Sequence, residues 1–365
     1  MQKRIVKTII SVGILIVSSS CANVGLSAIP QTREGYNQAL SNSDDQQFLL
    51  NIVRMHFGQT PYFVNVDNMV TSSTLTTSSG SSSITNGINT VSGAAGPFWS
   101  IAPQVTFAQT PTITYSPLQG SQFVSGMLAP ITLEKLSLLL QSGWSTAEVL
   151  KLTVEQIGQL SNGTTVLHPL SNMGSEQAAY NKFVNALDRL DLEDRIDFVT
   201  TKYKDEPAVV INFDDTAAAT EMCKLLQLKK VYKQLIFTHN IMPNNEDSEN
   251  IVFVQTRSFF SMLNFLSKGV SSDKDISQKY GIKRLIKDGE SIHADTSLTD
   301  GIFLVSELNK EPINTAVKVN FDNYWYYIAN NDIASKSTLV LLRITYSLQT
   351  GDLKANVPLI TIPTK

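Results

Sequence analysis

The stretch FWSIAPQVTFAQTPTITYSP, residues 98–117, alternates between apolar residues and small or polar ones. Alternation with a period of two is typical of a β-strand with one apolar face, because successive side chains point to opposite sides. Four residues are predicted to share the apolar face: Trp99, Ile101, Val105 and Phe107. The opposite face carries small and polar residues such as Gln104.

This predicted strand lies in a segment without charge. No Asp, Glu, Lys or Arg occurs from Asn68 to Leu133, although 17% of the chain is charged. Residues 72–96 are rich in Ser, Thr and Gly, and the stretch before them alternates less cleanly around Tyr62 and Val64. Two strands joined by a Gly/Ser-rich tip form a hairpin. The sequence therefore predicts a long uncharged β-hairpin.

Three interpretations of the hairpin are open at this point. Polar low-complexity tracts are commonly flexible surface linkers between packed strands. Depletion of charge is also typical of the centre of a subunit interface. The third interpretation is membrane insertion, for which a strand needs roughly 9–11 residues. One hairpin leaves unpaired edges in lipid, so insertion requires several subunits that each contribute two strands.

A helix is predicted before the hairpin, from residues at helical spacing: Phe48, Leu49, Ile52, Val53 and His56. Ser43 is expected to cap its start, with Asp44 and Asp45 placed where acidic groups favour the helix dipole. Gly58 and Pro61 are expected to end it. The apolar stripe predicts that one face of this helix packs on a core.

The N-terminal segment has the layout of an export signal. Lys3, Arg4 and Lys7 precede an apolar run at residues 9–17, and SSSC ends the segment at Cys21. The run is about half the roughly 20 residues of a membrane-spanning helix, which favours a signal peptide. Small residues directly before a cysteine resemble the bacterial lipoprotein signal. Ordinary cleavage and retention as an anchor are the alternatives.

The lipoprotein resemblance implies an acylated Cys21 as the first mature residue, although Ser18 stands where leucine is common. Several acyl chains hold a protein durably to a bilayer. Since Ala22 follows the cysteine, where aspartate favours inner-membrane retention, the expected location is the periplasmic face of the outer membrane. Cys223 is then the only other cysteine, which excludes an internal disulfide and suits a small buried hydrophobe.

Composition excludes one large class of partners. Removal of residues 1–20 leaves 26 Lys and Arg against 32 Asp and Glu, a formal charge of −6. A chain of this sign is a poor candidate for binding nucleic acid. With 42% hydrophobic and 17% charged residues, the chain has a globular composition.

The remaining sequence predicts an α+β fold with a mixed sheet covered by helices. Helical periodicity occurs at residues 132–141, 145–152, 175–190, 216–228 and 256–268. Strand patterns occur at 195–201, 208–213, 234–238, 251–254, 302–308, 317–321, 324–329 and 359–362. Residues 271–299 are polar and predicted to form a loop. The predicted organisation is a signal peptide at 1–20, a tether at 21–33, the helix with the hairpin at 34–130, and the mixed body at 131–365.

The sequence offers no recognisable catalytic or metal-binding motif. There is no GxSxG, HExxH, Walker loop, GxGxxG or EF-hand loop. The histidines His56, His168, His239 and His293 are far apart in sequence, and each is interpreted as structural. Asp215 is expected to cap the helix that follows it, with a cation site at Asp214 as the weaker alternative. The acidic run 244–250 reads as an exposed turn rather than a calcium site. No enzyme activity, metal or cofactor is predicted.

The densest aromatic cluster comprises Phe321, Tyr324, Trp325, Tyr326 and Tyr327. In a strand, Tyr324 and Tyr326 lie on one face and Trp325 and Tyr327 on the other. Packing of both faces in the core is one interpretation. The other is that one face offers flat amphipathic rings to a protein or a glycan.

Four blocks suggest a family: FLLNIVRMHFGQTPYF (48–63), TPTITYSPLQGSQFVSGMLAPI (110–131), TRSFFSMLNFLSKGV (256–270) and PLITIP (358–363). They resemble a group of proteobacterial envelope lipoproteins without established activity. The chain is also similar to lipoproteins of the outer-membrane complex of Dot/Icm-type secretion systems. The resemblance implies a structural component that contacts other envelope proteins or further copies of itself. A monomeric glycan-binding lipoprotein and an envelope hydrolase are the alternatives.

Overall fold

The chain folds as an α+β protein with a mixed sheet, as predicted. The computed structural model describes residues 24–81, 101–163, 173–239, 250–281, 286–287, 290–291, 296–351 and 360–363. The chain divides into two compact units, Met1–Pro61 with Val124–Leu353, and Tyr62–Phe123 with Lys354–Lys365. The N-terminal helix therefore belongs with the body, whereas the sequence grouped it with the hairpin.

The body contains a six-stranded sheet in the order β4-β3-β8-β7-β6-β5. Its strands are β3 (Val154–Ile157), β4 (Leu160–Ser161), β5 (Ile196–Tyr203), β6 (Glu206–Phe213), β7 (Gln234–Thr238) and β8 (Ile251–Thr256). Strands β7 and β8 are parallel, and the other neighbours are antiparallel. The sheet is therefore mixed rather than doubly wound.

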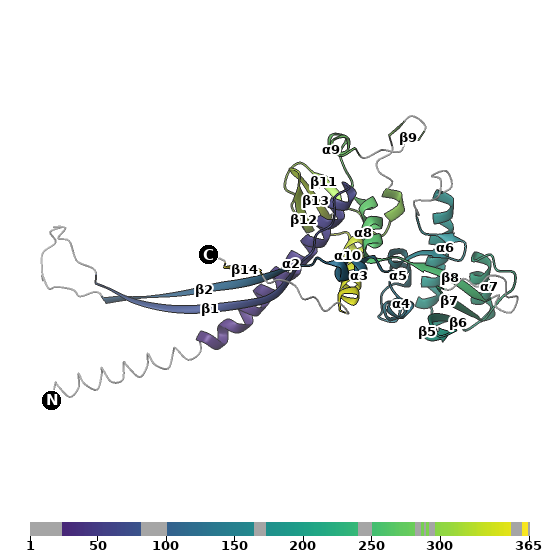
Figure 1. The fold of residues 1–365 in the computed structure, drawn as a ribbon, viewed down its shortest axis with the longest axis horizontal. Coiled ribbons are helices and arrows are strands. Elements are labelled where there is room, and N and C mark those ends of the chain that lie inside the picture. The colour runs from purple at the N-terminus through teal and green to yellow at the C-terminus, as the bar shows by residue number, and fades with distance from the viewer. Residues whose placement is uncertain are drawn as a thin grey trace, which may run out of the picture. The chain divides into compact units, whose positions relative to one another are not determined.

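Five helices of the body lie close to the predicted positions (Figure 1): α4 (Leu133–Leu140), α5 (Thr146–Thr153), α6 (Met173–Leu192), α7 (Thr216–Leu225) and α8 (Phe259–Leu266). Four of these helices, α4, α5, α7 and α8, start in the same way, because a side-chain oxygen of Thr132, Ser145, Asp215 or Ser258 accepts a hydrogen bond from the first helical turn. Apolar residues of these helices, among them Leu136, Val149 and Phe183, are buried in the core.

A smaller sheet has the order β11-β13-β12. It comprises β11 (Ser306–Leu308), β12 (Thr315–Phe321) and β13 (Tyr324–Ala329), all antiparallel. Asp322 and Asn323 connect β12 to β13 with φ values of 52° and 68°. Two consecutive positive φ angles match the tight turn whose twist suits a two-residue hairpin. The strand predicted at 302–308 is shorter than expected, since β11 covers only Ser306–Leu308 and Val305 makes an isolated bridge to Val270.

Helix α2 (Val24–His56) begins well before the predicted cap at Ser43. Ser43 is therefore inside the helix, and residues 24–33, predicted as a tether, are helical. Asp44 and Asp45 pair instead with Arg343, at 3.4 and 2.8 Å. The apolar stripe is confirmed, because Phe48, Leu49, Ile52 and Val53 are buried. Gly58, with a φ of +71°, follows the helix end as predicted.

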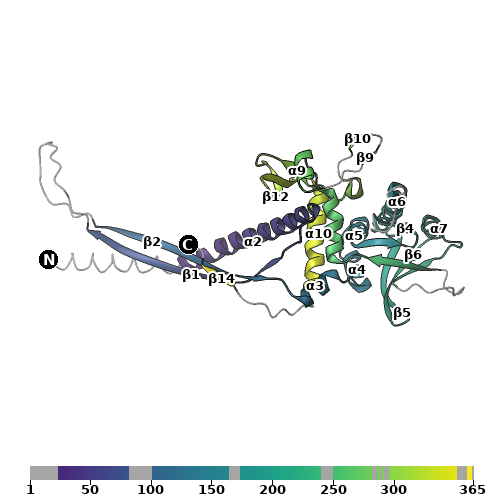
Figure 2. The same cartoon turned by 45° about the horizontal axis from the view of Figure 1, so that its top comes forward.

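Helix α10 (Ile333–Thr350) was not predicted from the sequence. Asp332 caps its start, and α10 packs beside α8, α5 and α2 (Figure 2). The predicted loop at 271–299 contains α9 (Lys274–Lys279), the 3₁₀ turn η2 (Thr296–Thr299), and the pair β9 (Ile286–Lys287) and β10 (Glu290–Ser291). The remaining short elements are α3 (Ser121–Leu128) and η1 (Ser267–Gly269).

The second unit contains the predicted hairpin. Strand β1 (Val64–Ser81) pairs antiparallel with β2 (Ile101–Pro117), and a register shift leaves Asp67 as an extra residue in β1. The C-terminal strand β14 (Ile360–Pro363) adds a third strand, but pairs only with Thr112–Tyr115 of β2. We refer to the paired segments Thr71–Ser81 and Ile101–Pro111 as the distal ribbon. Residues 72–81 of the predicted Ser/Thr/Gly-rich tip are instead part of β1, while Trp99 and residues 82–96 of that tip lie outside the described residues.

Candidate functional site

The distal ribbon has two open edges among the described residues. The sheet order β1-β2-β14 places β1 at one edge, and β14 covers the other edge only beside residues 112–115. A residue of a strand points both its N–H and its C=O to the same neighbour. Every second residue of the distal ribbon therefore directs its backbone groups away from the partner strand. Such edges are templates for pairing with another strand.

Of the predicted apolar face, Ile101, Val105 and Phe107 lie in β2, where Val105 is opposite Thr77 and Phe107 is opposite Leu75. The backbone alternation places these odd-numbered positions on one face of the strand. Cys21, the predicted lipidation site, lies outside the described residues.

The aromatic strand β13 has two different faces. Tyr326 and Ile328 are buried, and the ring of Tyr326 packs edge-on against Phe57, with ring centroids 5.8 Å apart. Trp325 and Tyr327, on the opposite face, are only half-buried. Their cross-strand neighbours are Asn320 and Lys318 of β12.

The half-buried face combines rings with polar groups. The Nζ atom of Lys318 lies 5.8 Å from the centre of the Trp325 ring, and it pairs with Glu311 at 2.8 Å. We call Trp325, Tyr327, Lys318 and Asn320 the aromatic face. Flat rings beside hydrogen-bond donors suit either a protein surface or a sugar ring.

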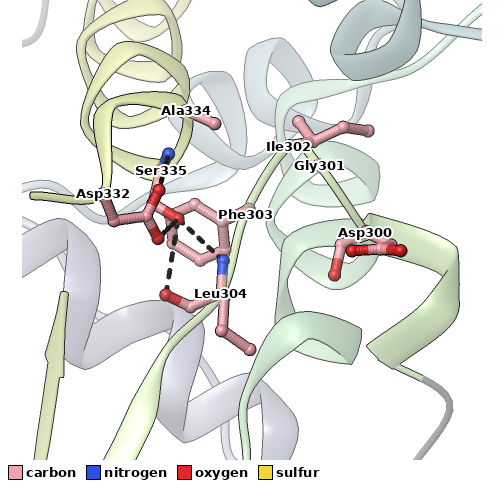
Figure 3. A pocket seen from close by; sticks show the side chains of 9 residues that line it. Asp300, Gly301, Ile302, Phe303, Leu304, Asp332, Ala334 and Ser335 are labelled. Carbon is pink, nitrogen blue, oxygen red and sulfur yellow. Dashed lines mark hydrogen bonds between the residues drawn. The ribbon is translucent and has the colours of Figure 1, made fainter. Parts of the chain in front are cut away.

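A cavity of about 460 Å³ lies at the start of α10, between Asp300–Leu304 and Asp332–Ser335 (Figure 3). Its best-placed carboxylate is already engaged: Asp332 accepts from both the backbone N–H and the hydroxyl of Ser335. The Ser335 hydroxyl in turn accepts from the Leu304 N–H at 2.8 Å. These bonds cap α10, and they hold the Asp332 carboxylate and the Ser335 hydroxyl to each other and to Leu304.

His56 is fixed by hydrogen bonds at the end of α2. Its Nδ1 donates to the Ser267 carbonyl at 2.9 Å, and its Nε2 accepts from the Ser272 hydroxyl at 3.2 Å. The Ser272 hydroxyl is also 2.8 Å from that of Ser277, and both serines are buried. Burial lowers the pKa of His56. These contacts tie α2 to η1 and the loop that follows it, which is a structural role.

The other candidate residues are distributed without forming a centre. His239 donates to the Val254 carbonyl at 2.8 Å, while His168 and His293 lie outside the described residues, as does most of the acidic run 244–250. Asp215 caps α7, as its position predicts, and it also pairs with Arg195. Cys223 is buried and unbridged, as expected. In the described parts of the chain, no three His, Cys, Asp or Glu side chains gather as metal ligands would.

Sequence reasoning missed the buried Arg257. Its guanidinium donates to the carbonyls of Lys151, Leu152, Val154 and Asn162, and it lies 4.0 Å from the centre of the Phe265 ring. Burial lowers the pKa of Arg257 to about 10, so it remains charged at neutral pH. Three of these carbonyls come from the end of α5 or directly after it, where no intrahelical donor is available. Arg257 is thus a structural cation, and its carbonyl partners leave no signal in a sequence.

Comparison with protein-family models, with curated proteins and with solved structures found no match. Within the described ranges, no helix combines the length and the apolar character needed to cross a membrane. The distal ribbon and the aromatic face are the two candidate interaction surfaces among the described residues.

Proposed function

We propose that this protein is a lipid-anchored structural component of an outer-membrane complex, and that the distal ribbon joins it to the other subunits. The observation that carries the proposal is the combination of length, absence of charge and open edges in the distal ribbon. Its 11 paired residues on each strand extend beyond the region that β14 covers.

The energetic argument concerns the third strand. An isolated two-stranded hairpin is marginally stable in water, and independent stability needs a third strand or a packed face. Strand β14 supplies a third strand only beside Thr112–Tyr115. A partner that pairs with the distal ribbon would supply the third strand that the described residues do not provide there.

The lipid anchor rests on the N-terminal sequence alone. Acyl chains at Cys21 would hold the chain to the membrane, since a chain with a net negative charge would gain little from anionic lipid. The four sequence blocks support a place among proteobacterial envelope lipoproteins, and the general likeness of the chain to lipoproteins of Dot/Icm-type secretion complexes supports a place in an assembly.

Extraction of the native protein from membranes in mild detergent tests the proposal. We expect wild-type protein to migrate as an assembly much larger than one chain, together with its neighbours. Cys21→Ser should be released from membranes, and a fatty-acid analogue should label the wild type but not this variant. A monomer on extraction would refute the structural role, and an unlabelled wild type would refute the anchor.

A second candidate is a glycan-binding lipoprotein, favoured by the half-buried rings of the aromatic face. Sugar rings stack on such side chains, and Asn320 and Lys318 would supply hydrogen bonds. Binding of wild-type protein to cell-wall fragments should be saturable and lost in Trp325→Ala. The control is Leu304→Ala, because Leu304 is exposed and lies in the segment before β11, outside the aromatic face. Equal binding by both variants would refute this candidate.

A further inference from the structure

The two edges of the distal ribbon are chemically different. Leu118 donates its N–H to the Phe63 carbonyl at 3.0 Å, which places Leu118 on the inner side of the ladder. The register of β2 is continuous from this point, because the shift in the ladder is confined to β1. Even-numbered residues of β2 therefore point their backbone groups toward β1, and odd-numbered residues point theirs outward.

This alternation determines where the prolines of β2 act. Pro103 and Pro111 are both odd-numbered, so the N–H groups that they lack belong to the outer edge of β2. Proline is tolerated in a strand at such an edge, and it weakens the edge as a template for pairing. Beyond Pro111, the same edge is occupied by β14. The outer edge of β2 is thus interrupted along its length.

The outer edge of β1 has no such interruption. The ladder places the odd-numbered residues from Met69 to Ser81 opposite the outward-facing residues of β2, so these seven residues also point outward. None of them is proline, and none is charged. Strands commonly protect an edge with charge or proline. Here β2 is protected and β1 is not.

We infer that β1 pairs antiparallel with β1 of a second copy of this chain. The inference rests on the proposed function and specifies which edge makes the contact. A two-fold interface brings the same surface from both subunits. In this interface the uninterrupted edge of β1 pairs with the same edge of the second copy, and the outer edge of β2 makes no contact. Along the distal ribbon the product has four strands, two from each copy, which exceeds the minimum for independent stability.

The register of this pairing follows from the outward-facing positions. Antiparallel pairing brings outward residues opposite outward residues, and residues 69–81 are all used when Leu75 lies opposite itself. Met69 then faces Ser81 of the second copy, and Ser73 faces Thr77. At about 3.4 Å per residue, the contact extends over roughly 40 Å. Cα atoms of such hydrogen-bonded pairs are about 5.5 Å apart.

Cysteine crosslinking in intact membranes tests this geometry. A Cα separation of about 5.5 Å permits a disulfide, so Leu75→Cys should form a dimer at least about tenfold more readily than Phe107→Cys. Phe107 is opposite Leu75 and lies on the outer edge of β2, which makes it a matched control. Wild-type protein under the same oxidation controls for native thiols, and Cys223 is buried.

A crosslink between two copies of Phe107→Cys would mean that β2 supplies the contact. A crosslink between Phe107→Cys and Leu75→Cys, present together in one membrane, would mean the same. Either result would overturn the inference. No crosslink from Leu75→Cys in an intact large assembly would also overturn it, while the proposed function would stand. If wild-type protein forms no large assembly, the proposed function itself is refuted. Failure of the β1 pairing and failure of the proposed function are therefore distinguishable.

Proline substitution gives an independent test without cysteine. Ser73→Pro removes one outward N–H of β1, and Gln109→Pro removes the outward N–H of the residue opposite it in β2. Neither change removes a hydrogen bond within the hairpin. We expect Ser73→Pro to reduce the dimer and Gln109→Pro to leave it unchanged. Equal amounts of dimer from both variants would contradict pairing through β1.

Discussion

The six-stranded sheet of the body and the distal ribbon differ in how their edge strands are protected against pairing with another chain. One edge strand of the body, β4, has two residues, and the other, β5, carries charged residues such as Asp197 and Lys202. Both devices discourage pairing with another chain. The distal ribbon instead has a long uncharged edge along β1. The comparison teaches that the chain can protect an edge and does not do so at β1.

The two regions also differ in how burial stabilises them. The body encloses large apolar side chains and even a charged group, Arg257, whose hydrogen bonds are all made to carbonyls. In the distal ribbon, the described backbone makes one ladder and leaves the other side open. Substitutions in the body should therefore change the free energy of unfolding, whereas substitutions in the distal ribbon should change assembly.

The largest effect on folding is expected for Arg257→Ala. Removal of the guanidinium leaves the buried carbonyls of Leu152 and Asn162 without their side-chain donor. The other two carbonyls keep a hydrogen bond from the Asn162 side chain. Each unsatisfied buried carbonyl costs about 1–3 kcal/mol. Arg195→Ala, at an ion pair near the surface, should cost much less, because solvent screens such pairs. Chemical denaturation of the purified variants measures both. Similar losses would contradict the structural role of Arg257.

The next effect tests the ribbon. Successive positions of β2 lie on opposite faces, so Val105→Lys and Gln104→Lys place the same charge on different faces. If the face of Val105 meets lipid or a packed subunit, lysine there should cost roughly 2–4 kcal/mol and reduce recovery of the assembly. Gln104→Lys should have a mild effect. Equal and small effects would identify the ribbon as an exposed linker.

The fold of the body was predictable where apolar residues recur at the spacing of a helix or a strand. Helices α4 to α8 and most strands follow apolar periodicity, and their caps are local. Helix α10 was missed because its buried face includes Ser335, Thr338 and Thr345, which do not read as apolar. Two of their hydroxyls bond to carbonyls, Thr338 to Ile302 and Thr345 to Leu341, and so they are buried without cost to hydrogen bonding.

The candidate surfaces were predictable in part. Absence of charge identified the hairpin, but the direction of the Pro103 and Pro111 nitrogens depends on a register that only the fold supplies. The predicted cap at Ser43 failed for a related reason, since Asp44 and Asp45 are held by Arg343, which is distant in sequence. In both cases the role of a residue depends on contacts with residues that are distant in sequence.

A smaller effect is expected at the start of α7. The Asp215 carboxylate accepts from the Ala218 N–H at 2.7 Å and so caps the helix. Asp215→Ala should therefore lower the free energy of unfolding, but by less than Arg257→Ala does. Asp214→Ala is the neighbouring control and should have almost no effect on folding or function. A loss of function at Asp214 with unchanged stability would instead favour the cation-site interpretation.

The smallest effect is a pH dependence that the body should show and the distal ribbon should not, because the latter has no titratable carboxylate, imidazole or amine. Burial lowers the pKa of His56 from its ordinary value of 6.5, with nearby Lys268 acting in the same direction. The unfolded chain therefore binds a proton more readily than the folded one, so stability decreases as pH falls below about 6.5. Thermal unfolding between pH 7.5 and 5.5 should show a declining Tm. His56→Gln, which can still donate to Ser267, should flatten this slope, and an unchanged slope would assign the effect to another group.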